Sequence, residues 1–108
     1  MSLSTHVLDA ATGTPAAGIV VHAESQVDGA WRPAAMGVTD ADGRVRDLSN
    51  PGAGVHRLTF GTGEYFGRLG IPAFYPEVTV TFQVTDAAAH YHVPLLLSPF
   101  AYSTYRGS

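Results

Sequence analysis

Two histidines stand two residues apart near the C-terminus and are candidates for acid–base or metal chemistry. His90 and His92 belong to AHYHVPLLLS, residues 89–98, a sequence that predicts a strand. Side chains at positions i and i+2 of a strand share one face and lie about 7 Å apart. Three interpretations stay open: two zinc ligands with His6 as a third, acid–base groups, or hydrogen-bonded imidazoles without a chemical role.

The remaining histidines stand singly in predicted strands. His6 lies alone in a predicted strand, and a histidine in a strand is more often structural than catalytic. His22 and His56 lie in ordinary strand patterns and are predicted to be structural. Because the chain contains no Lys, its five histidines are the main candidates for proton transfer near neutral pH.

Arg44 is the arginine placed closest to a turn signal. It follows Asp42-Gly43, and a solvated loop residue paired with Asp40 or Asp47 is its simplest interpretation. The chain has no glycine-rich phosphate loop and no Gly-x-Ser-x-Gly elbow. No sequence motif therefore gives this arginine a role by itself.

The last four residues, Tyr105-Arg106-Gly107-Ser108, put an aromatic ring, a cation and a hydroxyl at the end of the chain. Chain ends are usually frayed, and a terminal Gly-Ser can also derive from cloning, so a disordered tail is one interpretation. Residues 100–106 nevertheless alternate as a strand does, after the very short link Ser98-Pro99. A terminal strand tied into a sheet would hold these groups in place.

Composition excludes several kinds of chemistry and several classes of partner. The absence of Cys excludes disulfides, thiolate catalysis and cysteine-ligated zinc, and the absence of Lys excludes Schiff-base chemistry. A net charge of −3 lacks the basic footprint of a nucleic-acid-binding protein. The start MSLSTHVLDA shows neither a signal peptide nor a membrane span, so we expect a cytoplasmic protein with no membrane partner.

Alternating apolar residues predict the strands that would position these groups. The clearest strand is 78–85, where Val78, Val80, Phe82 and Val84 share one face. Further strands are expected at residues 3–9, 18–25, 30–38, 54–60, 89–98 and 100–106. One short helix is expected at residues 63–69, and turn signals at 40–43 and 50–52 predict loops. The pattern predicts an all-β, two-sheet sandwich forming one domain over residues 1–108.

The low proportion of charged residues indicates that this protein assembles with other subunits. Only 14% of the residues are charged and 45% are hydrophobic. We therefore expect part of the surface to be covered by partner subunits rather than by water.

Three motifs, in order along the chain, resemble the transthyretin-like family. They are HVLD at residues 6–9 followed by Gly13, Pro15 and Gly18, then YHVPLLLSP at residues 91–99, and YRGS at residues 105–108. The last motif is similar to the ending of the family's enzyme branch, the 5-hydroxyisourate hydrolases. Gly43-Arg44 fits the family's arginine position, whereas Ala101 departs from the expected Gly or Ser. The resemblance spans Leu3 to Ser108.

The resemblance implies a sandwich of seven or eight strands with one short helix, assembled as a homotetramer, a dimer of dimers. Its central clefts would lie between subunits. The implied reaction is hydrolysis of 5-hydroxyisourate to 2-oxo-4-hydroxy-4-carboxy-5-ureidoimidazoline during urate degradation, without a cofactor or metal.

By position, the resemblance implies catalytic roles for His6, Arg44, His92 and Ser108. Substrate binding would involve His6, Arg44 and the ending Tyr105, Arg106, Gly107 and Ser108. Either His6 or His92 would be the general base, the other orienting water or substrate. Arg44 would disfavour protonation of the nearby imidazole and stabilise an oxyanion.

Two alternative functions belong to other classes. The same central channel could carry a small molecule, as it does in transthyretin, or the sandwich could be purely structural. A passive apolar channel needs none of His6, Arg44, His92 or the YRGS ending, which favours the enzyme.

Overall fold

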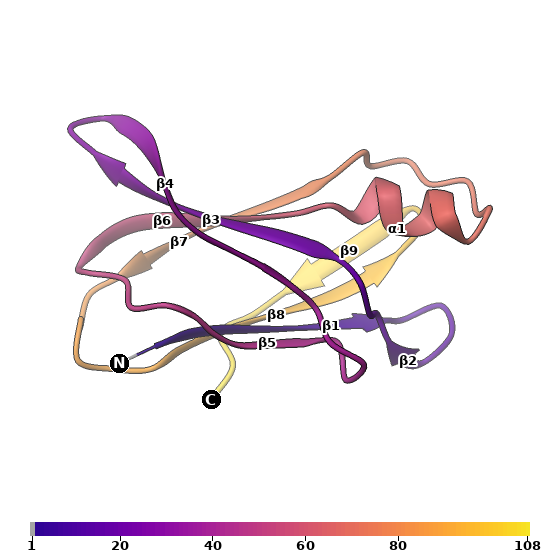
Figure 1. Cartoon of the computed structure of the whole chain (residues 1–108), viewed down its shortest axis with the longest axis horizontal. Helices are drawn as coiled ribbons and strands as arrows, with labels where there is room; N and C mark the ends of the chain where they lie inside the picture. Colours follow the sequence, from indigo (N-terminus) through magenta and orange to yellow (C-terminus); the bar gives the residue numbers. More distant parts are fainter. Residues whose placement is uncertain (1) are drawn as a thin grey trace.

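Two β-sheets stacked face to face make up most of the structure, a computed structural model that describes residues 2–108 (Figure 1). The first sheet holds β1 (Leu3–Asp9), β2 (Thr14–Pro15), β5 (Arg44–Ser49), β8 (Tyr91–Ser98) and β9 (Ala101–Thr104). The second sheet holds β3 (Val20–Val27), β4 (Ala30–Val38), β6 (Gly54–Phe60) and β7 (Val78–Val84). The expected all-β, two-sheet sandwich is confirmed, although residues 2–108 form nine strands where seven or eight were expected, one of them the two-residue β2.

Strand β1 pairs with two strands, β8 and β5, that carry candidate site residues. It pairs in parallel with β8, which sets Ser4 opposite His92 and His6 opposite Pro94. On its other side it pairs antiparallel with β5, which sets His6 opposite Arg44. Paired residues on neighbouring strands project from the same face of a sheet. The topology thus gathers an imidazole-rich and guanidinium-bearing surface from segments almost 90 residues apart in sequence.

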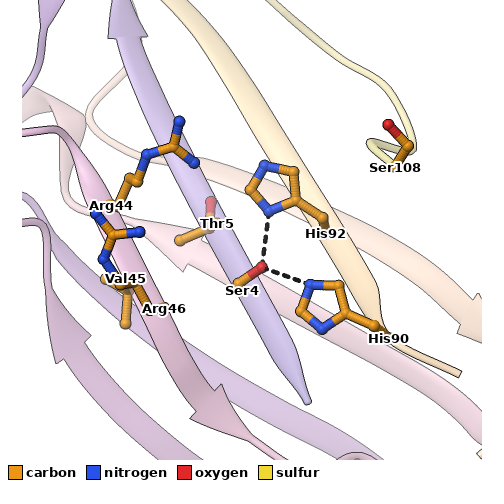
Figure 2. Close-up of a pocket in the computed structure, with 8 residues that line it drawn as sticks. All are labelled: Ser4, Thr5, Arg44, Val45, Arg46, His90, His92 and Ser108. Carbon is orange, nitrogen blue, oxygen red and sulfur yellow. Dashed lines mark hydrogen bonds between the residues drawn. The ribbon is translucent and has the colours of Figure 1, made fainter. Parts of the chain in front are cut away.

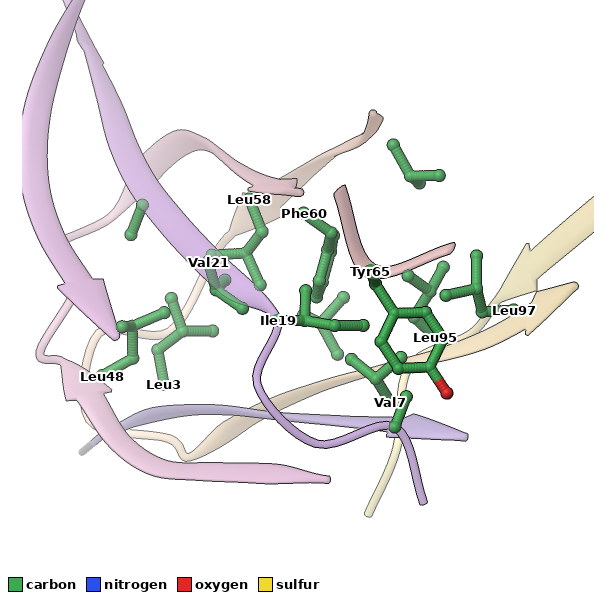
Figure 3. Packing of buried hydrophobic residues seen from close by; sticks show 14 of the residues in the cluster. Leu3, Val7, Ile19, Val21, Leu48, Leu58, Phe60, Tyr65, Leu95 and Leu97 are labelled. Atoms are coloured by element: carbon green, nitrogen blue, oxygen red, sulfur yellow. The ribbon is translucent and has the colours of Figure 1, made fainter. Parts of the chain in front are cut away.

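The opposite face of the same strands builds the hydrophobic core. Alternation along β1 buries Leu3 and Val7 completely, and Leu95 and Leu97 of β8 lie beside them (Figure 3). Burying a leucine or valine side chain is worth about 1.5–3 kcal/mol. The buried Thr5 hydroxyl also donates a hydrogen bond of 2.6 Å to the Val93 carbonyl. This packing gives the functional face a rigid backing.

Strand β5 was not expected, because its residues were predicted to follow a turn and enter a loop. The turn is present: the Asp40 carboxylate accepts hydrogen bonds from the backbone N–H groups of Asp42 and Arg44. A strand then begins at Arg44. Its sequence, RVRDLS, hides the strand pattern because three of its six residues are charged and Leu48 alone is buried. A register shift against β1 further breaks the alternation.

Helix α1 (Thr62–Arg68) matches the short helix expected at residues 63–69 to within one residue. It buries Tyr65 and Phe66 against the core. The Tyr65 hydroxyl donates to the buried Asp9 carboxylate at 2.9 Å, which ties the helix to the end of β1. No helix in residues 2–108 has the length and apolar character needed to cross a membrane.

Gly43, which precedes Arg44, is predicted to be needed for both its conformation and its closeness to β1. Its φ is +75°, and an added Cβ would lie 2.4 Å from the Val7 carbonyl oxygen. Gly13 provides a matched control, since its φ is +73° but nothing lies within 4 Å of an added Cβ. Both Gly→Ala changes incur the left-handed penalty of about 1–2 kcal/mol. The free energy of unfolding should fall by about 1–3 kcal/mol more in Gly43→Ala than in Gly13→Ala, because only the alanine at position 43 overpacks against β1.

Urea unfolding of the two variants at one protein concentration measures this difference. Equal losses of unfolding free energy would show that the contact with β1 has no energetic weight.

Candidate active site

A pocket of about 270 Å³ opens where β1, β5 and β8 run side by side (Figure 2). Its polar side chains come from all three strands, the segment before β8 and the C-terminus. They are Ser4, Thr5, Arg44, Arg46, His90, His92 and Ser108. Such a volume suits a molecule of the size of a small heterocycle.

His92 is the most strongly perturbed group in the pocket. Partial burial is the main cause that lowers its pKa below the ordinary 6.5, and the charge of Arg44 is the next. His6 and His90 act in the same direction, whereas a hydrogen bond to the Ser4 backbone opposes them. The ring is therefore neutral near pH 7, the form in which an imidazole can accept a proton.

Arg44 lies on β5 with its guanidinium turned toward the His92 ring (Figure 2). Within residues 2–108 no carboxylate lies at ion-pair distance from this guanidinium; the neighbouring Arg46 instead pairs with Asp42 at 3.5 Å. The predicted pairing with Asp40 is limited to the Arg44 backbone N–H. Its five donors are thus available to a ligand.

His6 lies next to this pocket without lining it. It sits opposite Arg44 in the β1–β5 register and is close enough to lower the pKa of His92. The zinc site considered for His6, His90 and His92 is not formed: among residues 2–108 no three His, Cys, Asp or Glu side chains are arranged to hold a metal ion.

The C-terminus is folded back against β8. The Gly107 N–H donates to the His92 carbonyl at 2.9 Å, and the two residues form an isolated bridge. An added Cβ on Gly107 would lie 2.5 Å from His92 Cδ2, so close approach to the imidazole is what requires glycine here. Ser108 then lines the pocket (Figure 2). Gly107 therefore contacts His92, and Ser108 lines the same pocket as His92.

Tyr105 and Arg106 point elsewhere. The Arg106 guanidinium lies 4.4 Å from the centre of the Tyr91 ring, a cation–π contact. Tyr105 is 58% exposed, and both residues line a second cavity near β7, which shares His92 with the first pocket. The terminal tetrapeptide is thus divided between two cavities that adjoin at His92.

Sequence reasoning missed Thr5, Val45 and Arg46 among the residues that line the pocket, and above all Ser4. Its hydroxyl oxygen lies 2.7 Å from His92 Nδ1. The available signal was its position on β1, two residues before His6 and so on the same face. His56, predicted to be structural, is buried with its ring nitrogens on the Ser25 hydroxyl and the Gly52 carbonyl.

The sequence matches the HIUase/Transthyretin family over residues 3–107. The chain belongs to this family. It is 46% identical to a 5-hydroxyisourate hydrolase of Salmonella dublin, with 98% of this chain and 80% of that protein covered. The structure resembles 5-hydroxyisourate hydrolase from Klebsiella pneumoniae, at 39% identity, a TM-score of 0.88 and full coverage of both chains.

A transthyretin is just as similar in fold. Sea bream transthyretin in complex with thyroxine gives a TM-score of 0.93 at 36% identity, covering 99% of this chain and 95% of that one. Members of the HIUase/Transthyretin family with different activities therefore share this fold. The activity has to be argued from the pocket.

Arg44 offers a direct test of the electrostatics in this family member's pocket. Arg44→Gln removes a positive charge and should raise the pKa of His92 toward its ordinary value, because protonation is then opposed by one charge fewer. Arg44→Lys retains the charge and should keep the pKa low. Titration of the His92 ring proton by NMR measures both. An unchanged pKa in the glutamine variant would contradict the proposed influence of Arg44.

Proposed function

We propose that this protein is a 5-hydroxyisourate hydrolase, which opens the ring to 2-oxo-4-hydroxy-4-carboxy-5-ureidoimidazoline during urate degradation. The observation that carries the proposal is the pairing of a neutral, partly buried His92 with the unpaired Arg44 in one pocket. A carrier channel requires neither a proton acceptor nor an unpaired guanidinium. Sequence identity is also higher to the Salmonella hydrolase than to the sea bream transthyretin.

In the proposed mechanism, His92 Nε2 accepts a proton from water as the water oxygen attacks a ring carbonyl carbon. The oxygen of that carbonyl becomes negative, and the Arg44 guanidinium donates hydrogen bonds to it. The carbon–nitrogen bond then breaks, and the proton held by His92 passes to the departing nitrogen. From the sequence, His6 and His92 are equal candidates for the base. His92 is favoured because it lines the pocket and because its pKa is lowered. His6 would orient water or substrate.

The ending contributes substrate contacts in this proposal. Ser108 would donate a hydrogen bond to substrate or water, and Gly107 keeps the backbone close to the His92 ring. Tyr105 and Arg106 do not line this pocket but a second cavity that also contains His92, and from there they would bind substrate beside a neighbouring subunit.

We further propose a homotetramer in the cytoplasm, which needs no cofactor. The edge strand β9 supports assembly, because Tyr102 is 41% exposed, and Phe100 just before the strand is 66% exposed. Exposed aromatic side chains on an unpaired edge favour a contact with another copy. Light scattering after size-exclusion chromatography measures the mass of the assembly.

The decisive experiment follows the ultraviolet absorbance of freshly made 5-hydroxyisourate with and without protein. The proposal predicts decay faster than the spontaneous rate, in proportion to protein concentration. A carrier would leave the decay unchanged and would bind thyroxine in calorimetry. That combination would overturn the proposal.

A further inference from the structure

A line of hydrogen bonds leads from His92 to the surface. The Ser4 hydroxyl oxygen lies 2.7 Å from His92 Nδ1 and 3.0 Å from His90 Nε2 (Figure 2). His90 Nδ1 in turn lies 3.0 Å from the Ser2 hydroxyl. The two rings are nearly parallel, at 17°, with centroids 6.5 Å apart. None of these contacts is required by the fold alone, since Ser4 and both rings lie on the face away from the core.

We infer that Ser4 and His90 are positioning residues that hold His92 in the tautomer with a free Nε2. The inference rests on the proposed function, in which Nε2 accepts the proton from water. It assigns roles to two residues that the reaction itself does not require.

Two arrangements keep the Ser4 hydrogen within the line. A serine hydroxyl has one hydrogen, so when Ser4 donates to one imidazole it accepts from the other. If His92 Nδ1 carries the proton, it donates to Ser4, and Ser4 donates to His90 Nε2. If His92 Nδ1 is bare, Ser4 donates to it and accepts from His90 Nε2. The tautomers of His90 and His92 are therefore coupled through Ser4.

Arg44 selects between the two arrangements. A guanidinium has only donors, so it favours a bare nitrogen on the side of the His92 ring that faces it. That side carries Nε2, because Nδ1 is hydrogen-bonded to the Ser4 hydroxyl (Figure 2). The proton then stays on Nδ1, Ser4 accepts it as a hydrogen bond, and Ser4 donates onward to His90. His90 keeps its own proton on Nδ1 and donates to Ser2.

The burial of the two rings fits these roles. His92 is half-buried beside Arg44, whereas His90 is exposed before the start of β8. An exposed imidazole is free to adopt the tautomer that its partners require. His90 can therefore accept from Ser4 without cost to the pocket.

Ser4→Ala is the variant that separates this role from simple packing. It removes the acceptor for Nδ1–H, so we expect His92 to populate both tautomers in long-range ¹H–¹⁵N spectra. We also expect kcat to fall roughly 10–100-fold, the effect typical of removing a partner that orients a functional histidine, with KM little changed. Ser4→Thr keeps the hydroxyl and should restore the single tautomer and most of kcat.

His90→Phe tests the outer link at an exposed position, so it stays informative if Ser4→Ala fails to fold. It should loosen the tautomer preference in the same direction by a smaller amount. A single Nδ1–H tautomer in both Ser4→Ala and His90→Phe would overturn the inference. The spectra do not depend on turnover, so an inactive wild-type protein would refute the proposed function while the tautomer measurement still decides this one.

Discussion

Replacing His92 by Asn is expected to lower kcat/KM for 5-hydroxyisourate by about 10²–10⁴-fold, the range that a general base contributes. Asparagine keeps a side-chain amide near Ser4 but cannot accept a proton from water at neutral pH. The loss should fall on kcat, because the groups that hold the substrate remain. Initial rates of absorbance decay, corrected for the spontaneous reaction, measure it.

His22→Asn is the matched control. His22 is exposed on β3, in the sheet that does not carry the pocket, and its replacement should leave the rate unchanged. If His92→Asn has the same kinetics as the control, His92 is not the base, and His6 becomes the candidate.

Removing Tyr105–Ser108 should reduce ring opening to the spontaneous rate while the sandwich stays folded. The deletion takes away the Ser108 wall of the pocket and the Gly107 hydrogen bond to the His92 carbonyl. A backbone hydrogen bond is worth about 0.5–1.5 kcal/mol and an exposed cation–π contact about 0.5–1 kcal/mol. Losing both leaves the core strands intact. Circular dichroism reports the fold, and the absorbance assay reports activity.

Gly107→Ala should lower activity without shortening the chain, because its Cβ would lie 2.5 Å from His92 Cδ2. Gly67→Ala, in α1, has open space around the added Cβ and serves as control. Full activity in the truncated protein would show that the ending has no part in the reaction.

The strands that sequence predicts well are those with one apolar face against the core. In β7, Val78 and Val84 are fully buried, as the alternation from residue 78 indicates. β5 follows a different rule, since it lies at the margin of the first sheet and keeps charged residues in solvent. Its apolar pattern is too sparse to distinguish it from a loop.

The sequence predicts which residue types could act in the site, but it does not predict which of them contact one another. Ser4 and His92 are 88 positions apart, and only the parallel pairing of β1 with β8 brings them to 2.7 Å. Local periodicity fixes the face of each side chain but not the register between distant strands. The direction of Tyr105 and Arg106 depends on where β9 ends, at Thr104, which the continuing alternation does not mark.

Fold similarity alone would not have separated the two activities in the family. The sea bream transthyretin matches this structure at least as well as the Klebsiella hydrolase does. In our proposal the distinction lies in a few polar groups on the outer face of one sheet, chiefly His92 and Arg44. We therefore expect activity to depend on the protonation state of one imidazole, that of His92.

The pH dependence of kcat/KM, measured beside the NMR titration of His92, tests that claim most directly. The base must be neutral, and its pKa is lowered below 6.5, so activity should stay level through neutral pH. Below that, kcat/KM should fall in proportion to the unprotonated fraction of His92, with the same midpoint as the NMR titration. An acid limb with its midpoint at 6.5 or above, or one that departs from the titration of His92, would contradict the account.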